Sequence, residues 1–303
     1  IASKYHDATY VTLDELNVLD AATNDPSGFI AGFRGMAIID EIQKAPAILP
    51  AIKASIDRNR LAGRFLLTGS ANVLTLPRVS ESLAGRLEVA TLWPMSQGEL
   101  SNEQERFIDD VFRGTLPRKR SIQTDILQTL VRGGYPESVN RSHASRRRAF
   151  FESYVTTLVS RDVRDIANID DPLALRRLLQ LAAARSATLL NASELSRSLG
   201  LPVSTLKRYM SLLETLFLVR EVGAWASNRG KRLVRSAKLH VVDTGLLAAL
   251  AGLDVEALRN NRQLIGALLE SFVVAELTKQ LGWSTPRASL FHFRTSAGRE
   301  VDV

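Results

Sequence analysis

The chain has 303 residues, 45% of them hydrophobic, and carries 39 Lys and Arg against 32 Asp and Glu, a formal net charge of +7. This length predicts two or three domains with packed cores. No apolar run approaches the about 18 residues of a membrane span, and no signal-peptide pattern opens the chain. The absence of cysteine excludes disulfides and thiolate metal sites. We expect a cytoplasmic protein with no membrane partner. Its net positive charge is compatible with nucleic-acid binding but does not establish it.

The two ends of the sequence indicate a piece of a longer protein. The chain begins at Ile1 and ends at Val303, each time within what resembles a strand. We therefore expect truncation at both ends, with parts of the sites discussed below lying outside these 303 residues.

The first part of the chain alternates short strand patterns with helices. Residues 9–13 are β-branched and aromatic, which predicts a strand. Residues 36–39 are four consecutive apolar residues, typical of a strand buried on both faces of a parallel sheet. A predicted helix at 51–58 and a second buried strand at 64–68 complete a right-handed βαβ unit. A further strand is expected at 87–92.

Two carboxylates follow the second strand where it leaves the sheet. Ligands of open α/β sheets bind at the carboxyl ends of the strands. Asp40 is therefore a candidate Mg²⁺ ligand, and Glu41 a candidate for orienting and polarising a water that attacks a phosphoryl group. This is the Walker B arrangement of P-loop ATPases. The alternative is an ordinary buried strand that ends at a solvated acidic turn.

Small polar residues follow the next strand, on the same expected edge of the sheet. Thr68, Ser70 and Asn72 are candidates for sensing a γ-phosphate or positioning water, unless they only cap the next helix. Arg86 is a candidate for stabilising charge on a phosphate transferred in a neighbouring subunit, and its alternative is an ion pair with a surface carboxylate.

These motifs in this order resemble the core of a prokaryotic AAA+-type ATPase family whose members carry a C-terminal domain of unknown function with a restriction-nuclease-like core. The resemblance rests on Ile-Ile-Asp-Glu-Ile-Gln at 38–43, Leu-Leu-Thr-Gly-Ser at 66–70 and Leu-Ala-Gly-Arg-Leu at 83–87. It implies ATP and Mg²⁺ as cofactors, with Asp40 as metal ligand, Glu41 as water activator, Ser70 or Asn72 as sensor and Arg86 as arginine finger.

The chain departs from that family at its phosphate loop. The pattern G-x-x-x-x-G-K-[ST], which supplies a backbone cradle and a lysine for the phosphates, occurs nowhere in residues 1–303. ATP binding is therefore expected of the intact parent protein, and this chain alone should bind ATP weakly or not at all.

The middle of the chain is predicted to be helical and to contain a winged helix-turn-helix. A basic stretch at 141–148 either contacts phosphates or forms a solvated helix face. Residues 193–199 predict a helix, 200–202 a tight turn, 204–216 a second helix capped by Ser204, and 217–222 a strand. In a nucleic-acid-bound form the second helix would face the major groove or its phosphates, through Ser204, Thr205, Lys207 and Arg208. Many such units serve only as protein contacts.

The last part of the chain predicts a long helix at 265–281 and a hairpin around residues 296–298. Restriction-nuclease-like cores place a helix glutamate beside a hairpin aspartate, and Glu270 with Asp302 fits that order. The E-x-K that would complete the site is expected beyond Val303. The alternative is a helix-surface acid and a strand-end acid.

The fold class we predict is α/β: a P-loop-type parallel sheet with helices, then a helical and winged-helix region, then a small nuclease-like α/β domain. The domain limits are 1–115 for the ATPase core lacking its phosphate loop, 116–170 for a helical connector, 171–225 for the winged helix and 226–303 for the truncated nuclease-like end. The predicted function is Mg²⁺-dependent ATP hydrolysis by the intact parent, coupled to DNA, RNA or partner binding, with a homo-oligomer as one arrangement. The alternatives are a non-enzymatic DNA-binding or scaffold protein and a nuclease-like protein using Glu270 and Asp302.

Overall fold

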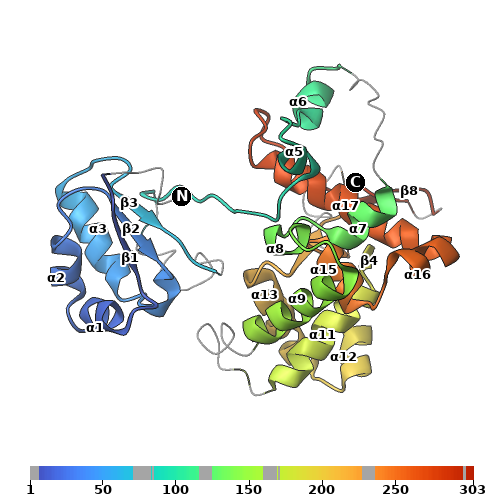
Figure 1. Ribbon diagram of the computed structural model, residues 1–303, viewed down its shortest axis with the longest axis horizontal. Coiled ribbons are helices and arrows are strands. Elements are labelled where there is room, and N and C mark those ends of the chain that lie inside the picture. The colour runs from blue at the N-terminus through green and yellow to red at the C-terminus, as the bar shows by residue number, and fades with distance from the viewer. Residues whose placement is uncertain are drawn as a thin grey trace. The chain divides into compact units, whose positions relative to one another are not determined.

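The computed structural model describes residues 7–70, 83, 85–115, 125–159, 169, 171–226, 236–295 and 298–303. It divides into two compact units (Figure 1). The first unit comprises Ile1–Val89 and Ser160–Asp170, and the second comprises Ala90–Val159 and Asp171–Val303.

The first unit is a parallel three-stranded sheet with helices between its strands. Its elements are β1 (Thr9–Thr12), α1 (Leu16–Asn24), α2 (Pro26–Ala31), β2 (Ala37–Asp40), the 3₁₀ helix η2 (Ile42–Lys44), α3 (Ile48–Arg58) and β3 (Phe65–Leu67). The strand order is β1-β2-β3, and β2 pairs in parallel with both neighbours. The mixed fold and the parallel sheet predicted for this part are confirmed.

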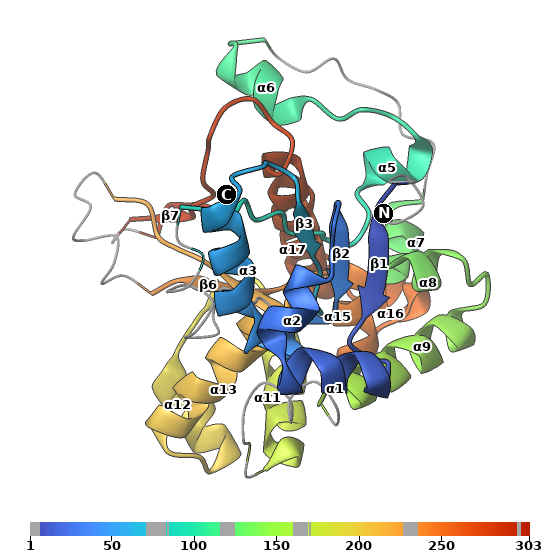
Figure 2. The ribbon, with the colours of Figure 1, turned by 90° about the vertical axis from the view of Figure 1, so that its left-hand side faces the viewer.

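The core of the first unit forms between this sheet and its helices. Ile39 of β2 is fully buried and lies in one apolar cluster with Ile48 and Ile52 of α3 and Ile30 of α2. Figures 1 and 2 show α2 and α3 on the same side of the sheet. Burial of the apolar run therefore holds β2 centrally, with its polar end at the edge of the sheet.

The strand expected at 87–92 is absent. These residues have no regular secondary structure, and Leu87, Val89 and Leu92 are exposed. No backbone hydrogen bond within the described part of the chain joins this stretch to another strand. Alternating apolar residues favour an extended chain, but a strand also requires a hydrogen-bonded neighbour.

The second unit is mostly helical. Its helices are α5 (Gln97–Ser101), α6 (Phe107–Phe112), α7 (Ile126–Arg132), α8 (Pro136–Val139), α9 (Ala144–Thr157), α11 (Pro172–Ala184), α12 (Ala192–Leu199), α13 (Val203–Thr215), α15 (Thr244–Leu250), α16 (Val255–Asn260) and α17 (Arg262–Leu281). Its strands are β4 (Thr188–Leu189), β5 (Val219–Val222), β6 (Lys238–Val241), β7 (Phe293–Arg294) and β8 (Glu300–Val301). One antiparallel sheet has the order β4-β6-β5, and β7 with β8 forms the predicted antiparallel hairpin.

A buried junction between the end of α7 and the start of α15 organises this unit. The carboxylate of Asp243 caps α15 by accepting from the N–H of Leu246 and also accepts from the N–H of Gly134, at 2.9 and 2.7 Å. A Cβ on Gly134 would lie 2.2 Å from the Met95 carbonyl oxygen, and one on Gly245 would lie 2.6 Å from that of Arg132. Only glycine allows these backbones to approach so closely.

Within the described residues, no helix is both long and apolar enough to cross a membrane.

Candidate functional site

Asp40 and Thr68 lie at the carboxyl ends of neighbouring parallel strands. Ile39 of β2 stands opposite Leu67 of β3, so the next residue of each strand reaches the same edge. The hydroxyl of Thr68 donates a hydrogen bond to Oδ1 of Asp40. The backbone continues the ladder, with Thr68 N–H donating to the Ile39 carbonyl at 3.0 Å. The predicted proximity of these two side chains is confirmed.

Tyr10 of β1 holds the other oxygen of the same carboxylate. Its hydroxyl donates to Oδ2 of Asp40 at 3.0 Å, and this hydrogen bond raises the pKa of Tyr10 because the carboxylate favours the neutral phenol. No pattern in the sequence predicts this contact. The strand register brings Tyr10 there, because it stands opposite Ile38, and Ile38 and Asp40 share one face of β2. Tyr10 of β1 and Thr68, which follows β3, thus meet at Asp40 of β2.

Glu41 has a left-handed backbone conformation, with φ 59° and ψ 43°, at the point where β2 gives way to η2. A non-glycine residue rarely adopts positive φ, and such conformations gather at functional sites. This turn directs the chain from the sheet edge into η2 immediately after Asp40.

Gln43 connects Glu41 to the end of the third strand. Its amide Nε2 donates to the Glu41 carboxylate and, at 3.0 Å, to Oγ of Ser70. Gln43 is only 9% exposed, and its buried Oε1 has no hydrogen-bond partner in the described structure. A buried acceptor without a partner can accept a hydrogen bond from a bound water molecule. The position of Gln43, two residues beyond Glu41, does not by itself predict this role.

Two further predicted site residues are the candidate arginine finger Arg86 and the candidate sensor Asn72. The guanidinium of Arg86 forms an ion pair with Asp57 of α3, Nε to Oδ1 2.7 Å, which matches the surface-pair alternative. This pair lowers the pKa of Asp57, chiefly through its hydrogen bond from Arg86. Asn72 lies outside the described residues.

The donor set at this edge suits Mg²⁺ and a water. Carboxylate and hydroxyl oxygens, here from Asp40 and Thr68, are the ligands that a hard cation prefers. Within the described ranges, no three or more His, Cys, Asp or Glu side chains are grouped to hold a metal ion by themselves. Mg²⁺ usually binds through one or two carboxylates together with waters and substrate phosphates, so a single carboxylate fits a nucleotide-bound ion.

The predicted helix, turn, helix and strand of the middle region are present as α12, residues 200–202, α13 and β5. Ser204, Lys207 and Arg208 are exposed on α13, and Thr205 is half-buried. Ser204 does not cap this helix, because α13 begins at Val203 with Pro202 in the N-cap position. The N-cap therefore lies two residues earlier than predicted.

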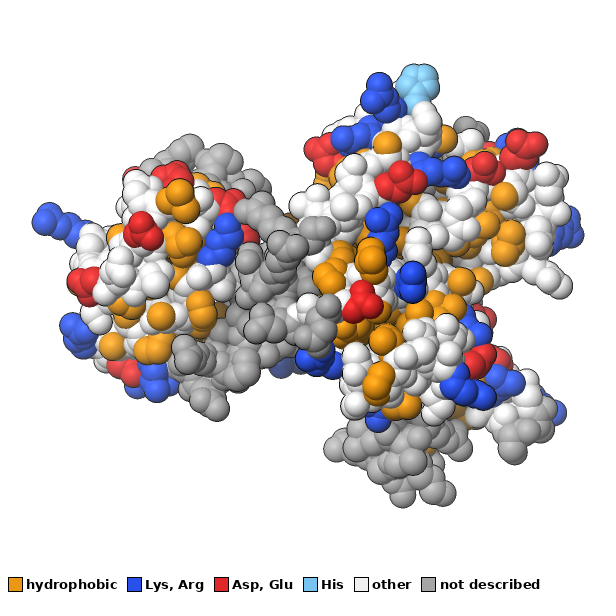
Figure 3. All heavy atoms as spheres, turned by 90° about the horizontal axis from the view of Figure 1, so that it is seen from below, with side chains coloured by type: hydrophobic (Ala, Val, Ile, Leu, Met, Phe, Trp, Pro, Cys, Tyr) orange, Lys and Arg blue, Asp and Glu red, His pale blue; other side chains and the backbone are white. Residues whose placement is uncertain are grey.

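The basic stretch at 141–148 is not a uniform solvated face. Arg147 is buried and donates to the carbonyl oxygens of Arg141 and Ser142, at 2.9 and 2.8 Å. Arg146 and Arg148 are exposed. In Figure 3 the Lys and Arg side chains of the visible face are interspersed with acidic and apolar ones.

Glu270 and Asp302 converge, as the sequence predicted, but on a lysine. Nζ of Lys238 in β6 lies 2.8 Å from Oε1 of Glu270 and 2.9 Å from Oδ1 of Asp302. Glu300 of β8 joins them at 2.6 Å. No sequence pattern predicts Lys238 at this place, because it lies 32 residues before Glu270 and 64 before Asp302.

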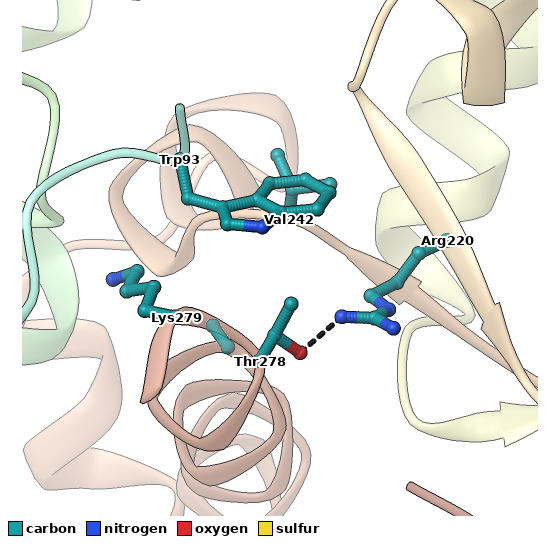
Figure 4. A pocket seen from close by; sticks show the side chains of 6 residues that line it. Trp93, Arg220, Val242, Thr278 and Lys279 are labelled. Atoms are coloured by element: carbon teal, nitrogen blue, oxygen red, sulfur yellow. Dashed lines mark hydrogen bonds between the residues drawn. The ribbon is translucent and has the colours of Figure 1, made fainter. Parts of the chain in front are cut away.

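A small pocket lies between β5, β6 and α17 (Figure 4). The Arg220 guanidinium points toward Thr278, to whose hydroxyl it donates, and lies 5.7 Å from the centre of the Trp93 ring. Lys279 extends away from them toward the Met95 carbonyl and Glu276. The free space holds about one water molecule, which excludes a nucleotide there.

Three family models match successive parts of the chain. Residues 1–101 match the family model of an AAA domain, residues 123–257 that of a domain of unknown function (DUF8612), and residues 265–303 that of another (DUF4143). These matches support an AAA-type ATPase domain followed by a C-terminal domain of unknown function. An AAA domain implies an ATP-binding function, usually with Mg²⁺.

Two curated relatives extend over nearly the whole chain. They are uncharacterized proteins of Mycobacterium bovis and Mycobacterium tuberculosis, each 30% identical over 293 residues, which cover 96% of this chain. The chain spans 61% of the length of either relative. No solved structure matches it significantly.

Proposed function

We propose that this chain is part of a Mg²⁺-dependent ATPase that couples ATP hydrolysis to binding of a nucleic acid or a protein partner. The observation that carries the proposal is the contact between Thr68 and Asp40 at the carboxyl ends of two parallel strands. Ligands of parallel α/β sheets bind at this edge. Residues 1–303 contain no phosphate-loop pattern, so the proposal concerns the intact parent protein and requires a phosphate cradle from outside these residues.

Each residue of the edge has a separate role in the proposal. Asp40 holds Mg²⁺, while Glu41 orients and polarises the attacking water. Thr68, Ser70 and Asn72 sense the γ-phosphate or position that water. What supports the role of Glu41 is its left-handed backbone and its link through Gln43 to Ser70, beside a buried amide oxygen without a partner.

Arg86 is the proposed arginine finger, acting on the nucleotide of a neighbouring copy in a homo-oligomer. This role requires its ion pair with Asp57 to open, since one guanidinium cannot keep that pair and also reach a phosphate in another subunit. A merely structural surface pair is the competing explanation.

The coupling partner is proposed to bind at the second helix of a winged helix-turn-helix. Exposure of Ser204, Lys207 and Arg208 on α13 supports this proposal, with Thr205 at the edge of the same surface. The same proposal places the domain boundaries at residues 115, 170 and 225. A DNA-binding or scaffold role without hydrolysis remains the non-enzymatic alternative.

A nuclease-like role of Glu270 and Asp302 is the third alternative. Their convergence supports a nuclease-like arrangement, whereas the ammonium of Lys238 between them argues against metal-dependent cleavage.

The test of the ATPase proposal is Glu41→Gln in the full-length parent protein. The amide keeps the size of the side chain but cannot polarise water as a carboxylate does. ATP binding should stay within about two-fold, while the hydrolysis rate falls about ten-fold to ten-thousand-fold. Both are measured on one preparation, by equilibrium binding of labelled ATP and by phosphate release. Unchanged turnover would remove Glu41 from the mechanism.

A further inference from the structure

Arg147 of α9 is a buried cation that has no carboxylate partner. It is 9% exposed, and its Nη1 donates to the carbonyl oxygens of Arg141 and Ser142, at 2.9 and 2.8 Å. Its buried Nε has no hydrogen-bond partner, and no carboxylate of the described residues forms an ion pair with it. The two buried lysines of the described residues, Lys238 and Lys279, are instead paired with carboxylates. A buried charge without a counter-charge is costly, which points to an anion from outside the chain.

A second arginine adds to the same positive charge. Arg132 ends α7, and its carbonyl oxygen accepts from the hydroxyl of Ser138 at 2.7 Å. The Ser138 carbonyl accepts from the N–H of Arg141, whose own carbonyl accepts from Arg147. The Nε of Arg132 is likewise buried without a hydrogen-bond partner in the described structure. Burial lowers the pKa of Arg147 and the charge of Arg132 lowers it further, so the two guanidinium groups repel each other.

The N-terminus of α9 lies at the same place and is also without compensation. The N-cap residue His143 makes no side-chain hydrogen bond to the helix, and the first turn holds no acidic residue. The N–H groups of Ala144 and Ser145 donate to no described residue. Residues 146–148, within the first five of the helix, are three consecutive arginines. Because the N-terminal end of a helix is electropositive, this position favours an anion and disfavours further cations.

The donors at this place match the chemistry of a phosphate group. A guanidinium group binds two phosphate oxygens at once through its parallel N–H donors, and free N–H groups at a helix N-terminus bind phosphate as well. Inorganic phosphate and terminal phosphate groups carry nearly two negative charges near neutral pH, whereas a phosphodiester carries one. Two neighbouring guanidinium groups without counter-charge therefore match a dianionic phosphate better than a nucleic-acid backbone.

We propose that the N-terminus of α9, together with Arg147 and Arg132, binds a dianionic phosphate group, either free phosphate or the terminal phosphate of a small molecule. The half-buried Arg132 and the part of Arg147 that stays exposed give the anion access from solvent. Arg146 and Arg148, both exposed, strengthen the positive potential around the site. The proposal is independent of ATP hydrolysis at the sheet edge and of nucleic-acid binding at α13.

The test is a titration of the full chain with inorganic phosphate by isothermal calorimetry, at an ionic strength held constant with sodium chloride. The native protein should bind about one phosphate per chain, and sulfate, a dianion of the same shape, should compete. Arg132→Gln should raise the Kd about ten-fold to hundred-fold, since it removes a charge-assisted hydrogen bond. Arg176→Gln, at a half-buried arginine of α11, is the matched control and should keep the native Kd. A native protein that binds no phosphate, or Arg132→Gln with the native Kd, would overturn the proposal.

Thermal unfolding separates phosphate binding from a structural role of the same arginines. Without phosphate, Arg132→Gln should be at least as stable as the native protein, because it removes a charge that repels Arg147. Phosphate should raise the Tm of the native protein more than that of the variant, since a ligand that binds the folded state stabilises it. Arg147→Lys is the second variant: it keeps the buried charge but not the paired donors, so it should fold and bind phosphate more weakly. Lower stability of Arg132→Gln with an unchanged response to phosphate would contradict the proposal.

Binding of duplex DNA at fixed salt distinguishes the dianion from a nucleic-acid backbone. Arg132→Gln should weaken DNA binding no more than Arg176→Gln does, because both remove one positive charge. A larger loss of DNA affinity in Arg132→Gln, with no binding of inorganic phosphate, would assign these arginines to a phosphodiester and overturn the proposal.

Discussion

The buried carboxylate of Asp243 accepts a hydrogen bond of 2.7 Å from the backbone N–H of Gly134, which lies 109 residues earlier in the chain. The same carboxylate caps α15 through the N–H of Leu246. Burial raises the pKa of Asp243, while the backbone donors act in the opposite direction. One side chain thus joins the end of α7 to the start of α15.

The first prediction concerns this junction. Gly134→Ala should lower the free energy of unfolding by about 1–3 kcal/mol or more, because the new Cβ would lie 2.2 Å from the Met95 carbonyl oxygen. Gly266→Ala is the matched control: it makes the same change in the exposed interior of α17, where no atom lies within 4 Å of the new Cβ. The control should gain about 0.5–1 kcal/mol. Urea unfolding measures both, and equal effects would contradict the assignment of the junction.

The second prediction separates stability from activity at Glu41. Because Glu41 has φ 59°, Glu41→Gly should keep or raise the free energy of unfolding, by up to about 1 kcal/mol, while hydrolysis by the full-length parent is lost. Ala187→Gly is the control, since Ala187 in the second unit has φ 65°. It should gain similar stability with hydrolysis intact. If Glu41→Gly destabilises the fold by several kcal/mol, the left-handed conformation is not the source of strain.

A third prediction tests the link made by Gln43. Gln43→Met keeps the volume but removes the hydrogen bonds to Glu41 and Ser70. The hydrolysis rate of the full-length parent should fall about ten-fold to hundred-fold with little change in ATP affinity. The reason is that a Glu41 carboxylate no longer held in place orients the attacking water less well but does not contribute to ATP binding. Lys44→Met, on the neighbouring residue whose ammonium pairs with Asp14, is the control and should keep the rate. An equal loss in both variants would indicate a general effect on η2.

The fourth prediction is a pH dependence from His240. Burial, followed by the charge of Lys238, lowers the pKa of His240 to about 4. Between about pH 6.5 and 4, His240 is protonated in the unfolded chain but stays neutral in the folded chain. The free energy of unfolding should therefore fall as the pH drops from 6.5 to 4. The loss is on the order of 3 kcal/mol at most. His240→Gln should flatten that part of the curve, measured by urea unfolding at each pH. Parallel curves for the two proteins would refute the shift.

The last prediction concerns nucleic acid. Lys207→Ala with Arg208→Ala should weaken binding of duplex DNA and reduce the slope of log affinity against log salt by about 1–2, since each phosphate contact releases counterions. Arg176→Ala with Arg177→Ala, on α11, removes the same charge elsewhere and is the control. Fluorescence anisotropy at several salt concentrations measures the slope. If both pairs change it equally, α13 is not the contact.

By itself the sequence determined the local elements and the polarity of their ends. A buried apolar run followed by Asp40 predicted both β2 and its polar end, because burial on two faces of a parallel sheet needs such a run and the sheet edge needs polar groups. The helices α12 and α13 and the β7–β8 hairpin followed from periodicity and turn residues for the same local reason.

Only the tertiary structure decided which side chains meet. Tyr10 and Gln43 reach the sheet edge through strand register and a left-handed turn, and neither leaves a mark in residue spacing. Lys238 joins Glu270 and Asp302 because β6 lies beside α17 and the C-terminal hairpin, and a contact between distant segments depends on packing. Residues 87–92 show the converse: their alternation favours a strand, yet a strand forms only where a neighbour supplies its hydrogen bonds.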